Sequence, residues 1–370
     1  MADGRTKDQR KADLLAHFAA NGYRRAAPTI LQPAAVFLDQ SGEDIRSRLY
    51  LTSDASGADL CLRPEFTIPV CRAYLETPTA GEHAAFSYFG PVFRFRPDGA
   101  GEFTQAGVES FGRSDREAAD AEILAVSLEA CAAAGARDLT VTLGDAALLN
   151  AFLEGLNLPP AWLRRLRHGL AQSRPLEAIF AEQTSATLDH SGVLAALEGA
   201  DKQGARALVE DLLSIAGIST VGGRSAGEIA ERFLEQASQR GGAQASDGQK
   251  ALIAAFLAIA GDPDAASAQL RDLARRADID MAAALDAFDT RVNFLAARGL
   301  DPAAMAFSAR FSRRLDYYTG FMFEARDPAR PDKPLVGGGR YDRLLRSLGA
   351  PRDIPAVGAA IWVDRLGATP

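Results

Sequence analysis

The strand pattern of this chain is clearest in two segments, FSYFGPVFRFR (residues 86–96) and FTQAGVESFG (residues 103–112). Both segments are rich in aromatic and β-branched residues. A short connection with proline, aspartate and glycine separates them at residues 97–102. This pattern predicts two antiparallel strands joined as a long hairpin.

Helical and strand-like segments surround the hairpin on both sides. Helical spacing of apolar residues predicts helices at 7–21, 68–76, 116–134 and 146–156. Alternating or β-branched runs predict further strands at 47–52, 59–62, 139–143, 306–311, 315–318, 321–325 and 356–361. Because strands and helices do not alternate regularly, the pattern predicts an α+β fold with a mixed, mostly antiparallel sheet.

The middle of the chain differs from both ends. Residues 159–299 are almost wholly helical in pattern and rich in alanine and leucine. We therefore predict a helical insertion at 159–299 that divides one sheet-containing domain into a first part at 1–158 and a second part at 300–370. The length of 370 residues agrees with about two or three such parts.

Composition narrows the class of protein. With 47% hydrophobic and 24% charged residues the chain is typical of globular domains. It has no apolar run long enough for a membrane span, and its charged first residues lack the apolar core of a secretory signal. Three scattered cysteines indicate free thiols and a cytoplasmic location. The net charge of −7 argues against nucleic-acid binding, which needs clustered basic charge.

The hairpin carries polar residues on defined faces. In strands, Arg94 and Arg96 share one face, and so do Gln105, Gly107 and Glu109. The glycine between the amide and the acid predicts space for a ligand above the sheet. The alternative interpretation is a solvated sheet face with ordinary cross-strand ion pairs, and on these residues alone it is the stronger one.

A second candidate element is the pair Glu65 and Thr67, where a carboxylate and a hydroxyl suit an ammonium group. Its alternative interpretation is a turn whose acid lies at a helix N-terminus, where the helix dipole favours negative charge.

The third element lies near the end of the chain, in RRLDYYTG (residues 313–320) and GGGRYD (residues 337–342). Arginine suits a carboxylate, acids suit an ammonium and tyrosines suit a polar ring, so the segments together predict a site for a small zwitterion. Arg313 and Tyr318 are five residues apart and share a site only if the chain bends. The triple glycine permits a close backbone approach or a tight turn between strand and helix, and it matches no phosphate-binding loop.

Together these segments resemble the catalytic domain of histidyl-tRNA synthetases, which are class II enzymes. The resemblance rests on LRPEFT at 62–67, motif 2 at 90–109, two histidine signatures at 313–320 and 338–342, and motif 3 at 357–366. It implies an antiparallel sheet flanked by helices and a dimer formed through about residues 22–62.

The resemblance also implies roles for single residues. In its histidine-binding set, the α-ammonium group is held by Glu65, Thr67 and Gln105. The imidazole is surrounded by Glu109, Tyr318 and Tyr341, and the carboxylate faces Arg313. All seven residue types are retained here. Buried polar groups built for one ligand reject analogues that leave them unpaired.

Three departures from the synthetases concern the nucleotide. The motif 2 loop at 97–102 has no lysine or arginine, and its two acids would repel a triphosphate. Trp362 stands where the synthetases have glycine, and the sequence stops at Pro370, which predicts no anticodon-binding domain. Arg94, Phe103 and Arg365 are retained. With Trp362, the resemblance implies that these residues form a vestigial nucleotide site.

A related family, the regulatory subunits of ATP phosphoribosyltransferase, resembles the chain over its full length and shares the RPEFT form of residues 63–67. The resemblance implies a regulatory protein without catalytic residues, metal or cofactor. It implies a hetero-oligomer with a short-form ATP phosphoribosyltransferase catalytic subunit, and feedback control by histidine. Histidine would bind in the inherited site or at a subunit interface.

Two alternatives remain open on the sequence. The first is an enzyme, a truncated histidyl-tRNA synthetase paralogue that activates histidine with ATP, and Arg94 and Arg313 keep it open. The second is a tRNA-binding module, against which the acidic balance argues.

Overall fold

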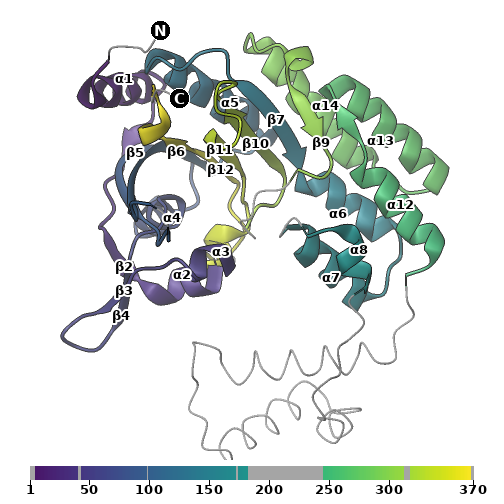
Figure 1. Cartoon of the computed structure of the whole chain (residues 1–370), viewed down its shortest axis with the longest axis horizontal. Helices are drawn as coiled ribbons and strands as arrows, with labels where there is room; N and C mark the ends of the chain where they lie inside the picture. Colours follow the sequence, from purple (N-terminus) through teal and green to yellow (C-terminus); the bar gives the residue numbers. More distant parts are fainter. Residues whose placement is uncertain are drawn as a thin grey trace, which may run out of the picture. The chain divides into compact units, whose positions relative to one another are not determined.

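The computed structural model in Figure 1 describes residues 5–40, 43–97, 99–171, 174–181, 245–311 and 317–367. The chain divides into two compact units, one formed by Met1–Gly155 with Ala255–Pro370 and the other by Leu156–Ala254. The predicted insertion extends to residue 299, whereas the larger unit includes the helices α13 (Pro263–Ala277) and α14 (Ala282–Ala297). The three-part division of the chain stays a prediction.

One sheet dominates the described part of the larger unit. Its strands follow the order β1-β5-β6-β12-β11-β10-β7-β9-β8. They are β1 (Arg24–Arg25), β5 (Ala84–Phe93), β6 (Glu102–Phe111), β7 (Thr140–Asp145), β8 (Ala260–Gly261), β9 (Ala306–Ser308), β10 (Phe321–Arg326), β11 (Pro334–Arg340) and β12 (Ala356–Trp362). The pairs β1–β5 and β7–β9 are parallel and the other neighbours are antiparallel, so the predicted mixed, mostly antiparallel sheet is confirmed.

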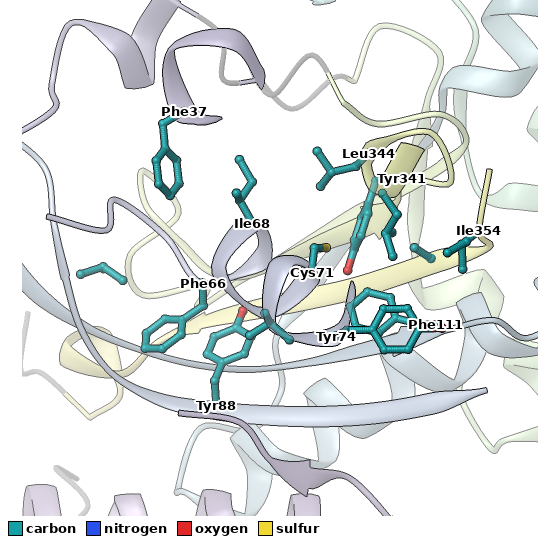
Figure 2. Close-up of a cluster of buried hydrophobic side chains, with 14 of the residues drawn as sticks. Phe37, Phe66, Ile68, Cys71, Tyr74, Tyr88, Phe111, Tyr341, Leu344 and Ile354 are labelled. Atoms are coloured by element: carbon teal, nitrogen blue, oxygen red, sulfur yellow. The ribbon is translucent and has the colours of Figure 1, made fainter. Parts of the chain in front are cut away.

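Two helices cover opposite faces of the central strands. On one face α4 (Thr67–Leu75) packs through Tyr74, whose ring stacks on Phe111 of β6 with centroids 4.6 Å apart. On the other face lies α5 (Arg116–Ala133), whose Asp120 accepts a hydrogen bond from Arg340 of β11. The face beneath α4 contains one continuous buried cluster of aromatic and aliphatic side chains (Figure 2).

The remaining described elements are mostly short. Helix α1 (Lys7–Ala20) begins with a capping box between Thr6 and Gln9, as its N-terminal sequence permits. The other helices are α2 (Ala34–Gln40), α3 (Glu43–Arg46), α6 (Ala146–Gly155), α7 (Pro160–Ala171), α8 (Leu176–Ala181), α12 (Asp247–Leu257) and α15 (Leu344–Ser347), with 3₁₀ turns at Pro302–Ala304 and Val363–Arg365. No described helix has both the length and the apolar character needed to cross a membrane. All three cysteines are buried and free, as predicted.

The triple glycine lies inside β11 (Pro334–Arg340), which agrees with the predicted close backbone approach and not with the alternative of a tight turn between strand and helix. None of the three glycines has a positive φ. They are needed for close approach, because a Cβ on Gly338 would lie 2.8 Å from the Phe323 ring and one on Gly339 would lie 2.8 Å from the Tyr318 ring. Neighbouring side chains therefore lie directly on the backbone of this strand.

Two predicted strand positions are wrong. Residues 47–50 follow α3 as a turn, with Arg48 N–H donating to Ile45 O at 3.0 Å, and the strand β3 (Leu51–Ser53) starts only afterwards. It pairs with β4 (Asp59–Leu62), which also pairs with β2 (Leu31–Pro33), in a separate small sheet. Tyr317 and Tyr318 lie in a turn and not in a strand, and the rest of the predicted strand at 315–318 lies outside the described residues.

Candidate ligand-binding site

The first site residue, Glu65, precedes helix α4 and caps it. Its carboxylate accepts the backbone N–H of Thr67 at 2.6 Å and of Ile68 at 2.9 Å. These N–H groups have no partner within the helix, and the helix dipole favours negative charge there. The side chain is 6% exposed, so the helix N-terminus holds a buried carboxylate. Glu65 thus lies at a helix N-terminus, as its alternative interpretation predicts. Its carboxylate oxygens still have lone pairs for a further hydrogen-bond donor.

Glu109 lies opposite, in the middle of β6, and is fully buried. It accepts the hydroxyl of Thr67 at 2.8 Å through Oε1 and the phenol of Tyr341 through Oε2. Its strand neighbour Gly358 has no side chain, and a Cβ there would overlap the Glu109 carboxylate. Thr67 therefore links the two carboxylates, because its N–H binds Glu65 and its hydroxyl binds Glu109.

The space predicted above Gly107 is filled. Tyr88, its direct partner across β5 and β6, covers the glycine, and a Cβ on Gly107 would overlap the phenol ring. The Tyr88 hydroxyl donates to Ala359 O at 3.2 Å. Phe66 stacks on Tyr88 at 4.5 Å between centroids (Figure 2). The glycine thus makes room for a protein side chain, so the prediction of ligand space at this position is wrong.

Gln105 completes the row on this face of β6. Its side chain is 1% exposed, and its Oε1 has no hydrogen-bond partner among the residues that the structure describes. A buried amide oxygen without a partner is costly and calls for an explanation. A bound donor such as an ammonium group would satisfy it.

Three tyrosines lie together beside Glu109. Tyr317 contacts both Tyr318 and Tyr341, with ring centroids 5.0 and 5.7 Å apart. Tyr318 lies on the backbone of Gly339 in β11. Both predicted tyrosines thus belong to one aromatic group. Arg313, the predicted partner of the ligand carboxylate, lies outside the described residues.

Burial changes the acidity of these groups. It raises the pKa of Glu109 to about 8, against the opposing effect of the hydrogen bonds from Tyr341 and Thr67, and the Glu65 charge raises it further. Burial also raises the pKa of Glu65, which backbone N–H groups and then Arg94 partly offset. Two carboxylates with raised pKa values, one of them on the same face of β6 as the unpaired amide oxygen, are suited to a cationic ligand.

The predicted vestigial nucleotide residues form a separate basic group at the end of the hairpin. Arg94 and Arg96 both lie over the Phe103 ring, at 5.5 and 4.2 Å from its centroid. Arg365 lies over Trp362 at 4.8 Å, and burial followed by repulsion from Arg96 and Arg94 lowers its pKa to about 10. The three guanidinium groups therefore create positive potential around two aromatic rings. Trp362 itself is buried.

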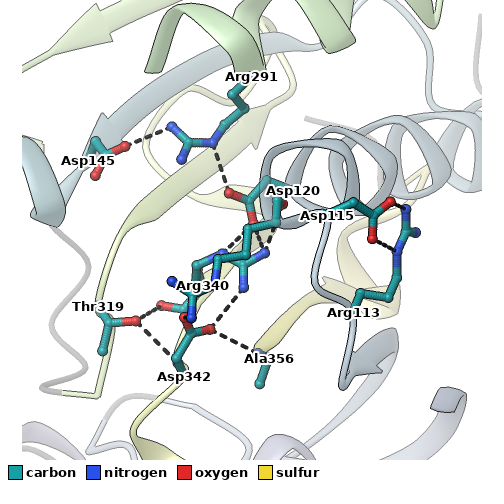
Figure 3. Close-up of polar contacts among 10 residues, drawn as sticks. Arg113, Asp115, Asp120, Asp145, Arg291, Thr319, Arg340, Asp342 and Ala356 are labelled. Carbon is teal, nitrogen blue, oxygen red and sulfur yellow. Dashed lines mark hydrogen bonds and ion pairs between the residues drawn. The ribbon is translucent and has the colours of Figure 1, made fainter. Parts of the chain in front are cut away.

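A buried network of arginines and aspartates lies on the opposite face of the sheet, beneath α5 (Figure 3). Asp120 accepts Arg340 Nε at 2.9 Å and Arg291 Nε at 2.8 Å. Arg340 also donates to Asp342 at 2.9 Å, and Arg291 donates to Asp145 at 2.7 Å. Burial lowers the pKa of Arg291 by itself, but Asp145 and Asp120 outweigh it and the pKa is raised.

The network also hydrogen-bonds to the segments that carry the two histidine signatures. Asp342 Oδ1 accepts the N–H of Ala356 at 2.9 Å, and the Asp342 N–H donates to Thr319 at 3.2 Å. Thr319 N–H in turn donates to Arg340 O at 2.8 Å. The network thus joins the two histidine signatures on one side of the sheet, while Tyr341, the next residue after Arg340, reaches Glu109 on the other.

The chain is similar to known proteins over most of its length. The family model for histidyl-tRNA synthetase matches residues 2–219 and 204–366. An ATP phosphoribosyltransferase regulatory subunit of Agrobacterium fabrum is 41% identical over 362 residues, which cover 96% of this chain and 95% of that protein. The regulatory subunit of Brucella canis is 42% identical over 349 residues, covering 92% and 91%.

The chain belongs to the family of ATP phosphoribosyltransferase regulatory subunits.

Solved structures show the fold of this family. A regulatory subunit/histidyl-tRNA synthetase from Bacillus halodurans has a TM-score of 0.67 at 22% identity, covering 99% of this chain and 81% of that one. A histidine–tRNA ligase subunit from Alicyclobacillus acidocaldarius has a TM-score of 0.56 at 25% identity, covering 100% and 95%. The class II synthetase-like fold predicted from the motifs is confirmed.

Sequence reasoning missed the buried network, although one signal was present. Asp120 occurs at helical spacing with Ile123, Leu124 and Ser127, all buried in α5. A lone acid within an apolar helical face indicates a buried cationic partner. The local sequence does not show which residue this partner is, because Arg291 and Arg340 lie 171 and 220 residues away from Asp120 along the chain.

Proposed function

We propose that this chain is a non-catalytic regulatory subunit that joins a short-form ATP phosphoribosyltransferase catalytic subunit, is required for the first step of histidine biosynthesis, and conveys feedback inhibition by histidine. The observation that carries this proposal is the identity of 41–42% with regulatory subunits over at least nine-tenths of both chains. Identity over the full length, and not in one domain, supports the same role.

The acidic cluster supports histidine as the ligand. The cluster comprises Glu65, Thr67, Gln105, Glu109 and Tyr341. An α-ammonium group has three N–H donors, which match the carboxylates and the unpartnered Oε1 of Gln105. An imidazole N–H would reach Glu109, and the tyrosines would contact the ring. Histidine bound there would favour a less active complex, with a coupling of about 1–3 kcal/mol.

The absence of catalysis is supported by the nucleotide region. Trp362 is 8% exposed, and Arg365 stacks on its ring, so the indole and the guanidinium contact each other. One face of the indole is thus occupied by a guanidinium and is not free for a nucleotide base. The acids of the hairpin connection would repel a triphosphate as well.

Reconstitution tests the proposal. The purified chain is mixed with a short-form catalytic subunit, co-purified, and assayed for phosphoribosyl transfer with and without histidine. We expect activation of the catalytic subunit and inhibition by histidine that requires this chain. Failure to co-purify or to activate would contradict the proposal.

A parallel assay separates the synthetase alternative. Histidine-dependent exchange between ATP and pyrophosphate by the purified chain would establish catalysis and contradict the regulatory role. Tyr318→Phe and Glu109→Ala measured for histidine inhibition then test whether the inherited site, and not a subunit interface, is the effector site.

A further inference from the structure

Glu65 and Glu109 are buried and are both bound to Thr67. The Thr67 N–H donates to Glu65 at 2.6 Å and its hydroxyl donates to Glu109 at 2.8 Å. The hydrogen bonds described for the two carboxylates come from uncharged groups: backbone N–H groups bind Glu65, and the Thr67 hydroxyl and the Tyr341 phenol bind Glu109. These described hydrogen bonds thus leave the charge of the two acids to be balanced by a proton or by a further cation.

The groups around the pair supply little positive charge. Helix α4 contributes Thr67 and the buried Cys71, and Tyr341 follows β11. Glycine faces Glu109 from β12. Arg94 acts on Glu65 through its field, but its Nε donates to Pro64 O at 2.7 Å. Thiol and phenol groups that approach two carboxylates stay protonated and add no cation.

Two like charges in one low-dielectric site do not both ionise at low cost. Buried carboxylate pairs keep one proton between them and titrate as a unit. A pair with one proton carries one negative charge. A pair with no proton and one bound ammonium group also carries one negative charge. The two states therefore leave the same net charge in the same buried volume.

We propose that the free site holds one proton on the Glu65–Glu109 pair and that a ligand ammonium group replaces this proton, so that the site releases a proton when it binds its ligand. The O–H bond of the carboxylic acid breaks, the proton goes to solvent, and the ammonium N–H bonds stay intact. This inference deepens the proposed histidine site and rests on it.

Geometry assigns the proton to Glu109. Glu65 accepts two backbone N–H groups at a helix N-terminus, an arrangement that favours its ionised form. Glu109 accepts only hydroxyl groups, and burial raises its pKa to about 8. The proton is then present at pH 6–7 in the free protein, and affinity for the cationic ligand rises as pH increases toward 8.

Titration calorimetry with L-histidine tests the proposal on the full chain. Binding is measured at pH 7 in two buffers with different enthalpies of ionisation, which gives the number of protons released. We expect a value close to one, and up to a tenfold gain in affinity per pH unit between pH 6 and 8. Glu109→Gln removes the titrating group and should abolish the buffer dependence, whereas Glu102→Gln, an exposed acid of the same strand, should retain it.

The outcomes separate this inference from the proposed site. Histidine binding with no proton release, or with equal release in Glu109→Gln, overturns the shared proton and leaves the histidine site intact. No binding of histidine by the parent chain overturns both. If Glu109→Gln binds too weakly to titrate, Glu65→Gln replaces it. Because burial is the main cause of the raised Glu109 pKa, Glu65→Gln should still release a proton on binding, and loss of release in this variant would overturn the assignment of the proton to Glu109.

Discussion

Two buried polar clusters lie on opposite faces of the same strands and differ in how their charge is neutralised. Beneath α5, the arginine–aspartate network surrounds Asp120 with Arg291 and Arg340. Beneath α4, the acidic cluster contains Glu65 and Glu109, whose described donors are backbone N–H and hydroxyl groups. Arg340 and Tyr341 are consecutive and enter one cluster each. In the described part of the chain, arginines bind the acid of the first cluster directly, whereas uncharged groups bind the acids of the second.

The comparison indicates different roles. A network whose charges pair with each other holds elements in place, because removing one member leaves the others buried and uncompensated. A cluster with two protonatable acids and an unpaired amide oxygen is destabilising without a ligand and is therefore typical of a binding site. Four measurements test this difference, beginning with the largest expected effect.

Removing the centre of the network should cost the most. Asp120→Ala leaves Arg291 and Arg340 without their shared partner, and we expect the free energy of unfolding to fall by about 3–5 kcal/mol in chemical denaturation. Asp272→Ala is the matched control, because Asp272 also pairs with two arginines but lies on the surface. Equal effects of the two substitutions would contradict the structural role of the network.

Replacing the buried acid Glu109 should raise the free energy of unfolding and not lower it. Between pH 4.5 and about 8 the folded chain holds a proton on Glu109 that the unfolded chain has lost, so stability falls as pH rises through this window. Glu109→Gln should remove this loss and raise the free energy of unfolding at pH 8–9 by on the order of a few kcal/mol relative to the parent. Denaturation at pH 5 and pH 9 measures it, with Glu102→Gln as control. Equal pH dependence in parent and variant would show that Glu109 does not titrate in this range.

A side chain added beneath Glu109 tests the packing of the acidic cluster. The Cβ of Gly358→Ala would overlap the Glu109 carboxylate, so we expect a loss of about 1–3 kcal/mol in stability and weaker histidine binding. Gly99→Ala is the control, since its Cβ would lie in open space. Normal stability and binding in Gly358→Ala would mean that Glu109 is placed differently in solution.

The smallest effect is expected from a single hydroxyl. Tyr318→Phe should weaken histidine binding by about 0.5–1.5 kcal/mol, as is typical for one hydrogen bond, and leave stability nearly unchanged. Calorimetry gives the affinity, and Tyr50→Phe, just before β3, is the control, because this tyrosine contacts Phe95 and no residue of the acidic cluster is among its described ring contacts. Unchanged affinity in both Tyr318→Phe and Glu109→Ala would remove the acidic cluster from the function.

Much of the fold was predictable because its signals are local. The hairpin, with its aromatic strands and Pro/Gly connection, is confirmed as β5 and β6, and α5 begins at the predicted Arg116. The triple glycine left two interpretations open, because close approach and a tight turn demand the same residue. Only the neighbours Phe323 and Tyr318, which come from another strand and a turn, distinguish the two.

For the site, the sequence by itself determined the chemistry of the residues and the faces they share: an acid before a helix, an amide and an acid two positions either side of a glycine, and tyrosines near the C-terminal glycines. Only the tertiary structure decided that Thr67 joins Glu65 to Glu109, that Tyr88 fills the space above Gly107, and that Asp120 meets two distant arginines. The physical reason is that a side chain's direction depends on local backbone geometry, whereas its neutralising partner depends on which distant segments the fold brings into the same low-dielectric space.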